Sequence, residues 1–95
     1  MRHVYAYSTV SGVEEHRVIH ATATAITVAA GISGQVVRRS ELDAPGAWYF
    51  TAPRLAIEAF VAKAQVALAD ASRKKHHAGW RAMLADARKR LEAVS

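Results

Sequence analysis

Residues 3–10, HVYAYSTV, decide how the fold begins, because small, mostly apolar side chains alternate along them with larger ring-bearing and polar ones. This alternation, together with the aromatic and β-branched content, predicts a β-strand. Ser11 and Gly12 follow as a turn signal, and residues 14–21, EEHRVIHA, predict the returning strand. We therefore expect the chain to begin with a β-hairpin.

Residues 21–34, ATATAITVAAGISG, are open to two interpretations. As a continuation of the second strand they would make it about three times the usual length of roughly 5–6 residues. As a short helix near residues 24–32 they would present one apolar stripe, although their β-branched side chains lose rotamer freedom in a helix. We favour the helix and keep the strand as the alternative. The helix would have Thr22 or Thr24 at its start, Gly31 or Gly34 at its end, and a stripe of Ala25, Val28, Ala29 and Ile32.

Two further strands are predicted before the C-terminal half. Residues 35–40, QVVRRS, predict a third strand, and residues 42–46, LDAPG, predict a turn. Residues 47–52, AWYFTA, have the aromatic density of a fourth strand. Trp48 and Phe50 would share one face of that strand, and we expect this face in the core.

Residues 53–71 predict a helix, with Pro53 at a first helical position. The helix is apolar on two sides, so we expect one side to cover the sheet and the other to need a second partner. The side expected on the sheet contains Ile57, Phe60, Val61, Ala64, Ala67, Leu68 and Ala71. The second side, named here the outer ridge, contains Leu55, Ala59, Ala62 and Val66.

Residues 72–81, SRKKHHAGWR, separate this helix from a second amphipathic helix over residues 80–94. One continuous helix over residues 53–94 would be about 63 Å long, which is long for so small a domain. Gly79 and the charged run favour a break near residues 76–79, with the continuous helix as the alternative.

These elements predict an α+β fold: a small antiparallel sheet, made of the N-terminal hairpin and one or two further strands, covered by two C-terminal helices. The length of 95 residues, with 52% hydrophobic and 22% charged side chains, predicts a single globular domain. We expect a β-rich half over residues 1–52 and a helical half, with a basic C-terminal helix, over residues 53–95.

The net charge of +5 lies entirely in residues 72–95, because acidic and basic side chains balance in residues 1–71. Such an uneven distribution favours an acidic partner, either a nucleic acid or the negative surface of a protein. The alternative is a solvated helix whose charges form pairs such as Asp86 with Arg90. Phosphate contacts by these basic side chains would make binding sensitive to salt.

No catalytic, metal or cofactor pattern is recognisable. Cysteine is absent, which excludes disulfides and thiolate chemistry. His16 and His20 have a zinc-binding spacing for a helix, but Arg17 stands where a zinc peptidase has its glutamate. On a strand the two histidines would be about 13 Å apart, too far to share one ion. We therefore expect no enzyme activity, cofactor or metal, and a soluble cytoplasmic protein without a membrane segment.

The sequence thus predicts a small binding module that docks onto a larger protein or nucleoprotein complex, as an inhibitor or adaptor. A phage-encoded blocker of the anti-CRISPR type is one version, inferred from size and absent chemistry rather than from any residue pattern. The alternative is a nucleic-acid-binding accessory or regulatory protein, and a homodimer through the helical ridges is a third possibility. The residues predicted to make contacts are Arg73, Lys74, Lys75, Trp80, Arg81, Arg88, Lys89, Arg90, Tyr5 and Tyr7.

Overall fold

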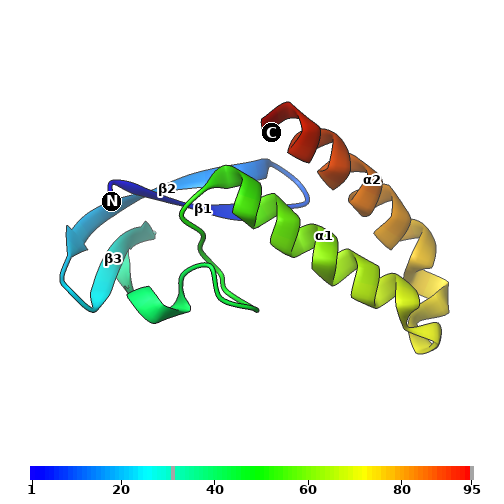
Figure 1. The fold of residues 1–95 in the computed structure, drawn as a ribbon, viewed down its shortest axis with the longest axis horizontal. Coiled ribbons are helices and arrows are strands. Elements are labelled where there is room, and N and C mark those ends of the chain that lie inside the picture. The colour runs from blue at the N-terminus through cyan, green and yellow to red at the C-terminus, as the bar shows by residue number, and fades with distance from the viewer. Residues whose placement is uncertain (31, 95) are drawn as a thin grey trace.

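The computed structural model describes residues 1–30 and 32–94, and the side chains of all of these except Ala30 and residues 71–73. It confirms the α+β fold, with a four-stranded antiparallel sheet in the order β1-β2-β3-β4 followed by two helices (Figure 1). The strands are β1 (His3–Ser8), β2 (Gly12–Ala21), β3 (Ala25–Ala30) and β4 (Ser33–Arg38). The helices are α1 (Pro53–Ala69) and α2 (His77–Val94), with short 3-10 turns at Arg39–Glu41 and Ala71–His76.

The predicted N-terminal hairpin is present, and a serine organises its turn. The Ser8 hydroxyl accepts hydrogen bonds from the backbone N–H groups of Val10 and Ser11, at 3.2 and 3.4 Å. Gly12 begins β2 with φ +80°, in the left-handed region that glycine adopts most readily. The turn is therefore set by its own residues.

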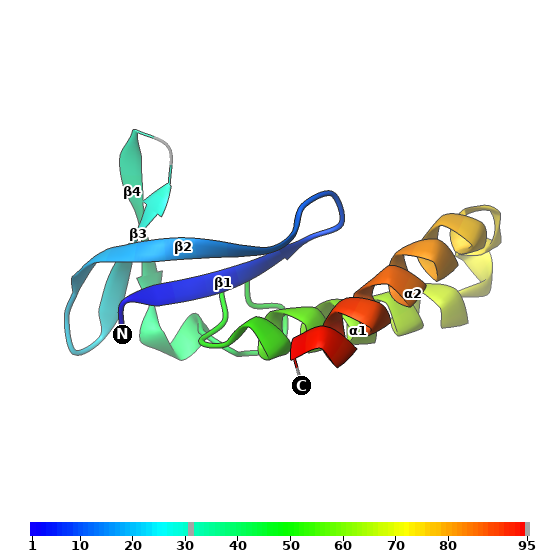
Figure 2. The ribbon, with the colours of Figure 1, turned by 90° about the horizontal axis from the view of Figure 1, so that it is seen from above.

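β2 is ten residues long because it serves two partners. Its first part pairs with β1, and the part from Val18 to Ala21 pairs with β3. The register shifts between Val18 and His20, and such irregularities increase the local twist of a sheet. As a result the β3–β4 hairpin stands across β1 and β2 at the end of the molecule away from the helices (Figure 2).

The helix expected near residues 24–32 is wrong, because this segment forms β3, the turn after it and the start of β4. Ile26 and Val28 lie on one face of β3 and are 1% and 0% exposed, so the β-branched side chains line the core. The Thr22 hydroxyl does not cap a helix; it accepts a hydrogen bond from the Ala25 N–H at 3.1 Å and organises the β2–β3 turn. Gly34 lies in β4, and Gly31 falls outside the described residues.

The fourth strand expected over residues 47–52 is also wrong, since this segment is a loop with one bridge between Tyr5 and Phe50. Asp43 has φ 59°, and its carboxylate accepts hydrogen bonds from the Thr51 N–H and hydroxyl at 2.8 and 2.6 Å. This clamp folds the segment back on itself. Phe50 is buried as expected, but Trp48 is 84% exposed, which overturns its expected place in the core.

The two C-terminal helices are separate, as predicted, but the break lies earlier than expected. α1 ends at Ala69, where Asp70 adopts an extended conformation, and the 3-10 turn over Ala71–His76 follows. The His77 ring nitrogen Nε2 lies 3.1 Å from the Asp70 carbonyl oxygen and holds the junction together. Gly79 lies inside α2 and does not cause the break.

The buried face of α1 is divided between the sheet and α2. Figure 1 shows the start of α1 beside β1 and β2 and its remainder beside α2, which runs back along it. Ile57 is completely buried at the sheet end. Further along, Ala64 and Ala67 are buried, as are Leu84 and Ala87 of α2, and small side chains let the helices approach closely. A separate cluster of Val4, Ile26, Val28 and Val37 forms the core of the sheet.

Candidate docking groove

Most of the predicted basic contact residues lie on the outside of the molecule. Lys74 and Lys75 are exposed in the 3-10 turn before α2. Arg81, Arg88 and Lys89 are exposed on α2, and Arg81 and Arg88, seven residues apart, lie on the same side of it. Within the described chain these five side chains take part in no ion pair or hydrogen bond. The side chain of Arg73, which was also predicted, lies outside the described residues.

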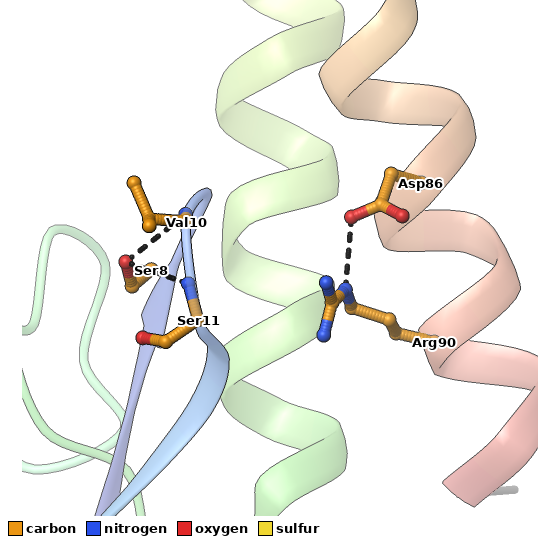
Figure 3. A network of polar contacts seen from close by, with 5 residues as sticks. All are labelled: Ser8, Val10, Ser11, Asp86 and Arg90. Carbon is orange, nitrogen blue, oxygen red and sulfur yellow. Dashed lines mark hydrogen bonds and ion pairs between the residues drawn. The ribbon is translucent and has the colours of Figure 1, made fainter.

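Arg90 does not belong to this outward-facing set. Its Nε donates a hydrogen bond to Asp86 Oδ2 at 2.8 Å, and Figure 3 shows the side chain reaching from α2 toward the β1–β2 turn. This hydrogen bond and the charge of the Asp86 carboxylate raise the pKa of Arg90 above its ordinary value. The structure therefore confirms the Asp86–Arg90 pair, and Arg90 joins the helical layer to the hairpin.

The predicted aromatic contact residues Trp80 and Tyr7 pack against one side chain, Phe60. The ring centroid of Phe60 lies 4.7 Å from that of Tyr7 and 6.2 Å from that of Trp80. The three half-buried rings join β1, α1 and α2. Burial raises the pKa of Tyr7, the Asp86 carboxylate raises it further, and Arg90 opposes the shift. Tyr7 and Trp80 are thus largely committed to internal packing, and Tyr5 is half-buried beside Phe50.

An exposed apolar groove lies between the outer ridge of α1 and the loop over residues 43–50, and the rings of Tyr7 and Phe60 also line it. The helix forms one wall of this groove and the loop forms the other, and the open space between them has a volume of about 970 Å³. Trp48 stands on the loop wall, 84% exposed, and Val66 stands on the helix wall, 72% exposed. Lys63, Glu58 and Asp70 lie along the helix wall as polar neighbours. Exposed apolar patches with polar rims are typical of protein interaction sites.

The loop wall of the groove is held in place from both ends. The Asp43 carboxylate binds Thr51 at one end of the loop, and Phe50 exchanges backbone hydrogen bonds of 2.8 Å with Tyr5 of β1. Between them Tyr49 donates a hydrogen bond from its hydroxyl to Gln35 Oε1 at 3.1 Å. The exposure of Trp48 is therefore a consequence of a fixed loop whose neighbouring rings point inward.

The sequence predicted the helix wall of this groove but not the loop wall. The outer ridge was expected to need a second partner, and α1 does leave Ala62 and Val66 exposed. The sequence does not predict Trp48 as a surface residue, because the aromatic pattern of residues 47–52 favours a strand with one buried face. The turn residues Pro45 and Gly46, directly before Trp48, are the signal that this segment belongs to a loop.

The histidines do not assemble into a metal site. The His16 ring packs edge-on against Tyr49, with centroids 5.4 Å apart, and His3 Nε2 lies 3.3 Å from Glu15 Oε1. Across residues 1–30 and 32–94 no three His, Asp or Glu side chains cluster as metal ligands would. No helix in the described chain is both long enough and apolar enough to span a bilayer.

No known protein family matches this chain, and no curated protein or solved structure shows significant similarity to it. Function is therefore inferred from the side chains themselves.

Proposed function

We propose that this protein is a non-enzymatic binding module, an inhibitor or adaptor, that docks an apolar segment of a partner protein into the groove between α1 and the 43–50 loop. One observation carries the proposal: Trp48 is 84% exposed on a fixed loop and lines the same groove as the apolar ridge of α1. Tryptophan is among the residues that most often dominate binding energy in protein interfaces. The polar rim would orient the partner without adding much affinity.

Site-specific photo-crosslinking tests this docking mode in the cells that produce the protein. A photoreactive amino acid replaces Ala62, which is exposed on the helix wall, or Ala85, which is exposed on α2 outside the groove. We expect a crosslinked partner protein from the Ala62 position and none from the Ala85 position. Replacing Trp48 with alanine in the same chain should weaken the Ala62 crosslink at least about tenfold.

Two results would contradict the proposal. Equal crosslinking from Ala62 and Ala85 would mean that the groove has no special role. A product that contains a second copy of this chain and nothing else would mean that the groove is a dimer interface through the helical ridges. Val10→Ser serves as a control for Trp48→Ala, because Val10 is 91% exposed in the β1–β2 turn.

Nucleic-acid binding through α2 is the second candidate, and a specific observation favours it. Arg81, Arg88 and Lys89 are exposed and have no acidic partner in the described chain. We expect labelled oligonucleotides to bind at about 50 mM salt and to dissociate as salt rises to about 200 mM. Removing Arg81 and Arg88 together should reduce the salt dependence, whereas Lys63→Gln in the groove should not.

The substitutions are preferable to removal of the whole C-terminal segment. A chain that ends at Asp70 would lose Leu84 and Ala87, which are buried in the interface with α1. Loss of binding by such a truncated chain would then report unfolding as readily as a missing contact. Binding that is unchanged by Arg81→Gln with Arg88→Gln would exclude α2 as the contact surface.

A further inference from the structure

β4 has one edge without a partner. It is the last strand of the sheet and pairs with β3, and within the described residues no backbone hydrogen bond joins its other edge to anything. At the opposite end of the sheet, by contrast, β1 is partly covered by the backbone of Phe50. A free strand edge is a template for pairing with another chain.

The direction of the unpaired groups follows from one hydrogen bond. The Arg39 N–H donates to the Thr24 carbonyl oxygen at 2.9 Å, so Arg39 points its backbone groups toward β3. In an antiparallel ladder these directions alternate from residue to residue. Gly34, Val36 and Arg38 therefore point their N–H and C=O groups toward the open edge.

This edge lacks the usual features that prevent pairing. β4 has the sequence SGQVVR, without proline or lysine, and its one charge, on Arg38, stands at the end of the strand. Val36 is 70% exposed. Figure 2 shows the β3–β4 hairpin projecting away from both helices, which leaves room for another strand beside it. Natural sheets normally protect such edges with charges, prolines or bulges.

An exposed apolar side chain and a groove lined by both polar and apolar side chains lie near this edge. Ile32, in the turn before β4, is fully exposed. At the other end of β4 a second groove, of about 390 Å³, runs between the strand and the 43–50 loop. Ser40, Pro45 and Trp48 are among the residues that line it.

We propose that β4 pairs in antiparallel fashion with β4 of a second copy of this chain, so that two four-stranded sheets become one. Since Gly34, Val36 and Arg38 supply the outward groups, a two-fold axis at Val36 lets every one of them find a partner. Val36 then faces its counterpart, and Arg38 faces glycine rather than another charge. The same symmetry brings the turn that carries Ile32 toward the end of β4 in the second copy, where the groove beside Trp48 lies.

The second copy is favoured as the occupant because one symmetry operation satisfies all three features. It pairs the free backbone groups, keeps the two Arg38 side chains apart, and brings the exposed Ile32 of each copy against the end of the other copy's β4. The inference does not rest on the proposed docking function, although both use the 43–50 loop, since Trp48 borders both grooves. Val36 does not line the docking groove, so substitutions at Val36 test the strand pairing without testing the docking function.

Light scattering on the full chain, from micromolar to near-millimolar concentration, tests the pairing. We expect the mass to rise toward twice that of the chain. Val36→Pro removes an N–H that points away from β3, so the ladder within the monomer survives while the dissociation constant of the dimer increases at least about tenfold. Val36→Thr keeps the N–H and the strand preference and should dimerise like the parent chain.

A monomer mass at every concentration would overturn the proposal, as would undiminished dimerisation of Val36→Pro. Circular dichroism checks that this variant is folded, and Val36→Lys, which brings two charges together at the axis, replaces it if it is not.

Thiol crosslinking tests the register directly, because the natural chain has no cysteine. Residues that form a hydrogen-bonded antiparallel pair have Cα atoms about 5.5 Å apart. A short bifunctional maleimide should therefore join two copies of a Val36→Cys variant. Val10→Cys places an even more accessible thiol in the β1–β2 turn and should give no dimer. Equal crosslinking of both variants would mean random collision and would contradict the register.

Discussion

The guanidinium of Arg90 lies where a Cβ atom on Gly12 would have to be. Gly12 begins β2 with φ +80°, and Arg90 is held in this position by Asp86 one turn earlier in α2. The hairpin and the last helix, which are distant in sequence, therefore meet at a residue without a side chain. This contact brings the end of α2 against the start of β2.

Gly12→Ala is expected to destabilise the protein more than Gly46→Ala. Both glycines have positive φ, +80° and +78°, which costs an alanine about 1–2 kcal/mol. Gly46 has open space around it, so the alanine there bears this cost alone, whereas at Gly12 the methyl group must also displace Arg90. Urea unfolding measures both. In an Arg90→Ala background the extra cost at Gly12 should disappear, and if it persists the Arg90 contact is not its cause.

Phe60→Ala is expected to cost about 2 kcal/mol of folding free energy. A fully buried phenylalanine would cost about 3–5 kcal/mol, but Phe60 is half-buried between Tyr7 and Trp80. In a Trp48→Phe background, the fluorescence emission of Trp80 should shift to longer wavelength because its ring becomes more exposed to solvent. Val66→Ala is the control, because a 72% exposed side chain on the same helix should matter little. Equal costs at Phe60 and Val66 would contradict the ring stack.

Gly79→Ala is expected to stabilise the protein by about 0.5–1 kcal/mol. Gly79 lies inside α2, with no atom within 4 Å of the position that a Cβ would occupy. Alanine adds helix propensity there without a clash. The exchange Ala78→Gly, at the exposed neighbouring position, should produce a loss of similar size. A destabilising Gly79→Ala would show that the segment needs the flexibility of glycine, as a break at this residue would require.

Stability is expected to fall at high pH in part through Tyr7. Burial, and then the Asp86 carboxylate, raise the pKa of Tyr7 in the folded chain above its ordinary value of 10.0. The unfolded chain therefore releases this proton at lower pH than the folded chain. The contribution is complete below about pH 10 and is lost as the pH rises through the folded pKa. Unfolding free energies of the parent chain and Tyr7→Phe, measured across this range, isolate the effect; parallel curves would exclude it.

Local patterns predicted those helices and strands in which the spacing of apolar side chains fits only one type of secondary structure. The alternation in residues 3–10 gave β1, and the two-sided apolar pattern after Pro53 gave α1. The segment over residues 21–34 was mistaken for a helix because alanine-rich stripes fit both periods when a strand is short. Ile26 and Val28 became strand residues because the sheet offers them a buried face, and that face is built by Val4 and Val37 from elsewhere in the chain.

The residues of the candidate site also fall into those that local patterns predict and those that only tertiary contacts place. The exposed basic side chains of α2 follow from the helical period alone, and so does the outer ridge of α1. Arg90 was counted among the exposed residues because nothing in its own helix shows that Gly12 lies opposite. Trp48 was placed in the core because the clamp between Asp43 and Thr51, which makes its segment a loop, is a tertiary feature.

The sequence by itself determined that a β-rich half precedes a helical half, that two helices follow Pro53, and that the positive charge is concentrated in the last quarter of the chain. These properties depend on near neighbours, through backbone preference and side-chain period. Tertiary structure alone decided which apolar surfaces were buried, that Phe60 would join Tyr7 to Trp80, and that Trp48 and the edge of β4 would remain open. Burial depends on which distant segments come together, and a one-dimensional pattern does not contain that information.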